Sequence, residues 1–150
     1  MLDEAPTSVT WPVTQYAYVE EHGPFMETAP RAWGTIHQRV PAIEAHNAIT
    51  GYLSLYKPEE QLYRAGVALA APPQQLPEGM QATVFAGGAY LRFVLQGAFD
   101  QLPAATSRAF EIVAARKLTL RDDFCIEHYV TDPRTTAVAD LITEILLPVG

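Results

Sequence analysis

The stretch FCIEHYVTDP, residues 124–133, places a carboxylate between a thiol and a phenol. Its Phe, Ile, Tyr and Val residues favour a β-strand, and Thr-Asp-Pro predicts the turn that ends it. Because alternate side chains of a strand share a face, we expect Glu127 to lie beside Cys125 and Tyr129, with His128 on the other face. A carboxylate in such a place can pair with a cation or, when desolvated, act as a general base. Alternation leaves another interpretation open, in which Glu127 faces solvent on an edge strand.

Other catalytic and binding chemistries find no support in the sequence. The four histidines show no HExxH spacing and have no cysteine partners, so we expect no zinc site. The chain also lacks a GxSxG nucleophile elbow, a P-loop and a GxGxxG fingerprint. The only cysteine, Cys125, has acidic neighbours that should raise the pKa of its thiol, which favours a buried structural residue over a nucleophile. No metal and no cofactor is therefore expected.

Composition excludes several further classes of protein. The 150 residues are 49% hydrophobic and 18% charged, which is typical of one compact, soluble domain. A net charge of −7 argues against direct binding to nucleic acid, because Lys and Arg must neutralise phosphates. No apolar run approaches the ~20 residues of a membrane span. The acidic N-terminal segment resembles neither a secretory signal nor a transit peptide, and a single cysteine suits the cytoplasm.

The first half of the chain reads as strand, helix, strand, strand. The strands are TQYAYVEEH, GYLSLY and YRAGVALA. Trp33, Ile36, Val40 and Ile43 recur at helical spacing between the first two strands. Pro30 is acceptable if it lies in the first turn of this helix, whereas Pro41 is expected to kink or end it near residues 39–40.

The second half follows a Pro-rich and Gly-rich linker, APPQQLPEG, and repeats the same order of elements. Its strands are TVFAGGAYLRFVLQ, with a turn or bulge at Gly87-Gly88, then FCIEHYV and LITEILLPV. A helix is predicted over residues 102–117. Its apolar stripe would consist of Leu102, Ala105, Ala109, Ile112, Val113 and Arg116.

The two halves align as a duplication. Tyr16 lies seven residues before Gly23 and Tyr90 lies seven before Gly97, and a phenylalanine follows each glycine by two residues. A shift of 73 residues superposes the strand of residues 52–56 on that of residues 125–129. We therefore predict an α+β fold of two strand-helix-strand-strand modules, about residues 13–70 and 82–149, in one domain of residues 1–150. Short connections require antiparallel pairing of the last two strands of each module.

If a pseudo-twofold axis relates the modules, the matched strand faces line one central pocket. Rings in such a pocket attract a bound cation by about 0.5–2 kcal/mol each, and Glu127 would supply its charge partner. Two alternatives remain open. The tyrosines are then ordinary half-buried residues of their strands, and the tryptophan belongs to the core between the helix and the sheet. The aromatic wall predicted for this pocket consists of Tyr52, Tyr56, Tyr129 and Trp33.

Five pieces of the sequence, in order, resemble the GyrI-like (gyrase-inhibitor-like) family: EEHGPFMETAPRAW, YRAGVALA, LPEGMQATVFAGGAYLRFVLQGAF, CIEHYVTDP and ITEILLPV. This family includes the effector-binding domains of some AraC-type and MerR-type multidrug-responsive regulators. The resemblance covers residues 13–149. It implies a curved antiparallel sheet with two helices on its outer side and a central pocket for hydrophobic, often cationic, molecules. It also implies that Glu127 is the charged ligand contact and that Tyr129 is an aromatic contact.

The chain departs from the family pattern in two places. The first module keeps the glycine-proline-aromatic sequence at residues 23–25, but the second has Gly97-Ala98-Phe99, which is expected to loosen that turn without changing the fold. Only a dozen residues precede Val13, too few for a helix-turn-helix, so no DNA-binding domain is expected.

Three functions follow from these features. The first is a stand-alone binding protein that senses or sequesters a hydrophobic, cationic small molecule. The second, implied by hydrolases in the same family, is hydrolysis of strained cyclopropane-type DNA-alkylating compounds, with Glu127 as the catalytic general base. The third is an interaction with a separate protein such as gyrase, which the family name suggests.

Overall fold

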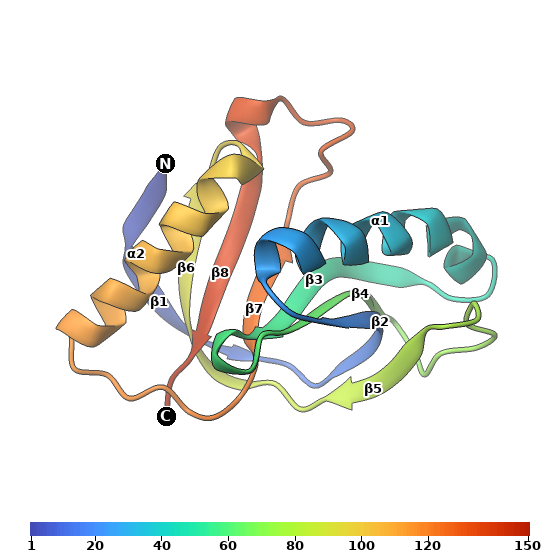
Figure 1. Ribbon diagram of the computed structural model, residues 1–150, viewed down its shortest axis with the longest axis horizontal. Helices are drawn as coiled ribbons and strands as arrows, with labels where there is room; N and C mark the ends of the chain where they lie inside the picture. Colours follow the sequence, from blue (N-terminus) through green and yellow to red (C-terminus); the bar gives the residue numbers. More distant parts are fainter. The chain divides into compact units, whose positions relative to one another are not determined.

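The computed structural model describes residues 1–150, which divide into two compact units. Unit 1 consists of residues 1–11 and 88–150, and unit 2 consists of residues 12–87. Each unit contains four antiparallel strands and one long α-helix (Figure 1). The α+β class and the antiparallel pairing that the sequence predicted are confirmed.

Unit 2 contains the first predicted module and one further strand. Its strands lie in the order β3-β4-β2-β5. All three predicted strands are present, and a short 3-10 helix, Pro58–Glu60, connects the last two of them. The elements are β2 (Thr14–His22), α1 (Phe25–Glu44), β3 (Ile49–Lys57), β4 (Leu62–Leu69) and β5 (Gln81–Phe85).

Helix α1 packs over β2 and β4 and buries Ala32, Ile36 and Ile43 against them. Both Pro30 and Pro41 lie inside this helix, so of the two alternatives predicted for Pro41, a kink or an end, the end is wrong. Pro30 lies beyond the first turn. Both prolines are exposed, where each removes one backbone hydrogen bond on the solvent side. Burial of Ile36 before Pro41 and of Ile43 after it keeps the last turns on the sheet.

Unit 1 contains the second module and the N-terminal segment. Its strands lie in the order β1-β6-β8-β7, and α2 packs over β1, β6 and β8 (Figure 1). Helix α2 therefore leaves the face of β7 largely uncovered. The elements are β1 (Leu2–Trp11), β6 (Gly88–Gln96), the 3-10 helix Phe99–Gln101, α2 (Leu102–Ala115), β7 (Cys125–Tyr129), the 3-10 helix Val138–Asp140 and β8 (Ile142–Pro148).

Three details of unit 1 differ from the prediction. The N-terminal segment forms β1, which the sequence did not reveal because its charged residues and Pro6 mask any alternation. The predicted strand of residues 83–96 is two strands, since Gly87 (φ 71°) and Gly88 (φ 125°) turn the chain between β5 and β6. Arg116 is exposed just beyond the end of α2, whereas the other five residues of the predicted stripe are buried.

Each module receives its fourth strand from the residues that precede the other module. Strand β1 comes directly before β2 in sequence but pairs with β6, over residues 2–11. Strand β5 comes directly before β6 but pairs with β2. Unit 1 is therefore built from two separate stretches of the chain.

The turns that lead into the two helices have the same backbone form. Gly23 and Gly97 adopt φ angles of 126° and 131°, a conformation that other residues rarely reach. The next residues, Pro24 and Ala98, have φ angles of −57° and −63°. The duplication inferred from sequence is thus present in the structure, and Ala98 adopts a backbone conformation close to that of Pro24.

Candidate ligand-binding site

Glu127 and Tyr129 share one face of β7, as alternation predicted. The Tyr129 hydroxyl donates a 2.7 Å hydrogen bond to Oε1 of Glu127. Both side chains are partly exposed, on a strand that α2 does not cover. His128 points to the opposite face, where its Nδ1 lies 2.8 Å from Oε1 of Glu144. The Tyr129 hydroxyl therefore orients the Glu127 carboxylate, and the residue keeps part of its surface exposed.

Burial raises the pKa of Glu127, and the hydrogen bond from Tyr129 offsets this only in part. No Lys or Arg side chain pairs with Glu127. By contrast, Glu20 pairs with Arg64 and Glu144 pairs with Arg92. Glu127 is thus a desolvated acid whose charge the protein itself does not neutralise.

Phe99 belongs to the same cluster, although it was not among the predicted site residues. Its ring packs edge-on against Tyr129, with 5.8 Å between ring centroids, and 38% of the residue is exposed. The repeat contains the same pair, since Phe25 packs edge-on against Tyr56 at 5.7 Å. The duplicated glycine-x-phenylalanine pattern is the sequence signal that could have identified Phe99.

The corresponding strand of unit 2 carries a polar network in place of the acid. Ser54 is fully buried, and its hydroxyl lies 2.6 Å from the hydroxyl of Tyr63. The indole nitrogen of Trp33, on α1, donates to both oxygens, at 3.1 and 2.8 Å. Trp33 therefore links helix to strand, which supports its alternative interpretation as part of the helix-to-sheet core. Tyr63 was not predicted to take part.

The predicted aromatic residues fall into two groups. Tyr129 lies with Glu127 in unit 1, and Trp33, Tyr52 and Tyr56 lie in unit 2. Tyr56 is 3% exposed and packs against Phe25, whereas Tyr52 is partly exposed on β3.

Cys125 shares the face of Glu127 but is buried. It is 4% exposed, and burial together with the nearby Glu127 carboxylate raises the pKa of its thiol to about 12. No three His, Cys, Asp or Glu side chains are grouped so that they could hold a metal ion. No helix is long and apolar enough to cross a membrane.

The chain belongs to the GyrI-like small molecule binding domain family, which matches residues 4–150. The resemblance seen in the sequence is therefore confirmed. No curated protein sequence matches the chain.

Solved structures share this fold at low sequence identity. The C-terminal domain of EcmrR is 16% identical, with a TM-score of 0.80 and coverage of 97% of both chains. The chain spans only 57% of the length of EcmrR in its complex with DNA, at 17% identity and a TM-score of 0.77. SAV2435 bound to tetraphenylphosphonium is 14% identical, with a TM-score of 0.77 and coverage of 97% of this chain and 94% of SAV2435. A Listeria innocua hydrolase is 10% identical, with a TM-score of 0.64 and coverage of 98% and 92%. At these identities the likeness shows the fold alone.

Proposed function

We propose that this protein binds a hydrophobic organic cation and thereby senses or sequesters it. Glu127 is the charge partner in this proposal, and Tyr129 supplies an aromatic contact beside it. The observation that carries the proposal is a desolvated carboxylate, oriented by Tyr129, that has no cationic partner in the protein. A carboxylate that is largely desolvated and has no partner is costly to ionise, so a cation that replaces the missing partner gains free energy from the pairing.

The family and one structural relative support a cationic ligand. The matching family is described as a small molecule binding domain. SAV2435, which has the same fold, binds tetraphenylphosphonium, a cation with four phenyl groups. Such a ligand combines the apolar surface that aromatic side chains favour with a charge that a carboxylate can neutralise.

The test is calorimetric titration with three phenyl-substituted ligands that differ in charge. Tetraphenylphosphonium should bind with micromolar affinity, which corresponds to about −8 kcal/mol. Triphenylphosphine oxide, which is neutral, should bind at least about tenfold more weakly, and the anion tetraphenylborate more weakly still. Equal affinity for the cation and the neutral ligand would show that no charge partner operates.

Hydrolysis is the second candidate, favoured by the same carboxyl group. A carboxylate with a raised pKa is a stronger general base, and a tyrosine hydroxyl beside it can polarise a substrate carbonyl. A Listeria innocua hydrolase has this fold. Incubation with excess cyclopropane-type electrophile separates the candidates, because an enzyme consumes many equivalents and a binding protein protects only one per chain.

A further inference from the structure

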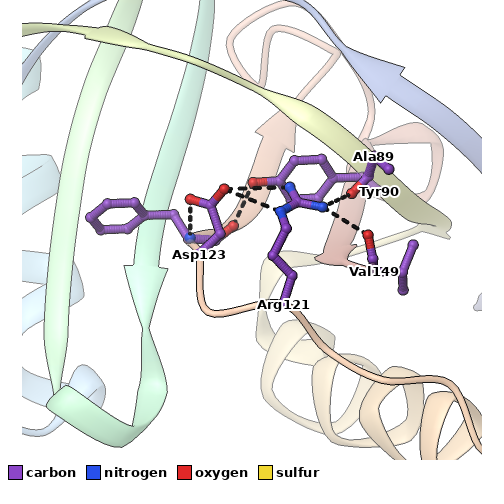
Figure 2. A network of polar contacts seen from close by, with 6 residues as sticks. Ala89, Tyr90, Arg121, Asp123 and Val149 are labelled. Carbon is purple, nitrogen blue, oxygen red and sulfur yellow. Dashed lines mark hydrogen bonds and ion pairs between the residues drawn. The ribbon is translucent and has the colours of Figure 1, made fainter.

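A polar network fixes the chain at the point where it enters β7 (Figure 2). The hydroxyl of Tyr90, on β6, donates a 2.7 Å hydrogen bond to the backbone oxygen of Phe124. The backbone nitrogen of Phe124 donates to Oδ1 of Asp123 at 2.8 Å. Side chains therefore hold both backbone polar groups of the residue that immediately precedes β7.

Arg121 keeps this network in place. Its guanidinium lies 5.0 Å from the ring centroid of Tyr90 and 3.4 Å from Oδ2 of Asp123. The same group donates to the backbone oxygens of Ala89, at 2.5 Å, and Val149, at 2.8 Å (Figure 2). The loop before β7 is thus tied to the start of β6 and to the residue that follows β8.

Strand β7 is short, Cys125–Tyr129. Its register with β8 extends over four residue pairs, from Ile126 to Tyr129. Glu127 lies three residues after Phe124, a distance of about 10 Å along an extended strand. Phe124 is therefore an anchored residue close in sequence to the start of the strand that carries Glu127.

We propose that Tyr90, held by Arg121 and Asp123, is a positioning residue for Glu127. This inference rests on the proposed function, because positioning matters to binding only if Glu127 contacts the ligand. Burial raises the pKa of Tyr90 far above its usual range, so its hydroxyl remains a hydrogen-bond donor at all ordinary pH values.

The duplication provides a matched control. Tyr16 occupies the position of Tyr90 in the other repeat, and both tyrosines are fully buried. The Tyr16 hydroxyl also donates to a backbone oxygen, that of Leu53 in β3, at 2.9 Å. Strand β3 carries Ser54 where β7 carries Glu127, so removal of the Tyr16 hydroxyl should affect folding without disturbing a charge partner.

The experiment compares Tyr90→Phe with Tyr16→Phe in the full chain. Each variant keeps its ring and loses one buried hydrogen bond, so both should unfold at a somewhat lower temperature than the wild type. Only Tyr90→Phe should reduce the preference for tetraphenylphosphonium over triphenylphosphine oxide, by about fivefold or more. An unchanged preference in Tyr90→Phe, or an equal loss in Tyr16→Phe, would overturn the inference.

A second measurement needs no ligand. Carboxyl carbon NMR titration of Glu127 should give a lower pKa in Tyr90→Phe than in the wild type, because a less constrained β7 exposes the carboxylate to water. Tyr16→Phe should leave this pKa unchanged. If the wild type binds no cation, the proposed function is refuted. The NMR titration then decides by itself whether Tyr90 positions Glu127. An unaltered pKa of Glu127 in Tyr90→Phe refutes that role.

Discussion

Replacing Glu127 with glutamine isolates the effect of its charge on ligand binding. Glutamine has nearly the same shape, and its side-chain oxygen can still accept the 2.7 Å hydrogen bond from Tyr129. The strand and its neighbours should therefore remain in place. Any loss of affinity then reports the attraction between a carboxylate and the bound cation.

The expected loss follows from two opposing effects. Opposite charges about 4 Å apart attract by about 4 kcal/mol at the effective dielectric constant typical near a protein surface. Part of this attraction is offset because burial raises the pKa of Glu127, so that ionisation of the carboxyl group itself costs free energy. We expect a net loss of at least about 1.4 kcal/mol, or tenfold in affinity for tetraphenylphosphonium.

Calorimetric titration across a range of pH provides the assay. In the wild type, affinity for the cation should fall as the pH is lowered through the raised pKa of Glu127, because protonation removes the negative charge. In Glu127→Gln the affinity should be weaker and independent of pH over the same interval. Glu111→Gln, which removes the same charge from an exposed site on α2, is the control. Undiminished cation affinity in Glu127→Gln, or an equal loss for triphenylphosphine oxide, would refute the reasoning.

Four further predictions concern stability and reactivity. The folded protein raises the pKa of Glu127, so ionisation of this carboxyl group lowers the stability of the wild type as the pH rises through the raised pKa. Chemical denaturation should therefore show that Glu127→Gln is more stable than the wild type at neutral pH. This difference in stability should disappear below the ordinary pKa of glutamate. Ala98→Pro should stabilise the protein by about 0.4–1 kcal/mol, since Ala98 has the φ of −63° that proline requires, and a loss of stability would show that the turns are not equivalent. Gly66→Ala should cost about 1–3 kcal/mol or more, because a Cβ there would lie 2.4 Å from a backbone oxygen, and a neutral result in the same denaturation assay would contradict the packing described. Cys125 should resist a thiol reagent such as iodoacetamide at pH 8 until the chain unfolds, and rapid labelling of the native protein would refute its burial.

Periodic features of the sequence predicted the local structure of the site. The two-residue period of a strand was enough to place Glu127 beside Tyr129 and to direct His128 to the opposite face. The duplicated spacing of Tyr16 and Tyr90 from their glycines correctly indicated two equivalent modules, because a repeated pattern reflects a repeated backbone.

Features that depend on tertiary contacts were not predictable in the same way. Pro41 opposes helix formation locally, and only the burial of Ile43 beyond it explains why α1 continues. Strand β1 has little alternation of its own and forms because β6 provides a pairing edge. Phe99 and Tyr63 join their clusters through contacts across the fold, which strand periodicity does not encode.

The interleaved strands impose an order on assembly during protein synthesis. Residues 12–87 form a continuous unit, so all of its strands are available for pairing once residue 87 leaves the ribosome. Strand β1, in contrast, must wait for β6, which begins 77 residues after the end of β1 (88 − 11 = 77). At about 5–20 residues per second this wait lasts roughly 4–15 s. Two charges, Asp3 and Glu4, followed by Pro6, oppose pairing of the waiting strand with other nascent chains. Strand β7, which carries Glu127, follows β6 in the chain, so the charge partner for a ligand is synthesised only after all of unit 2.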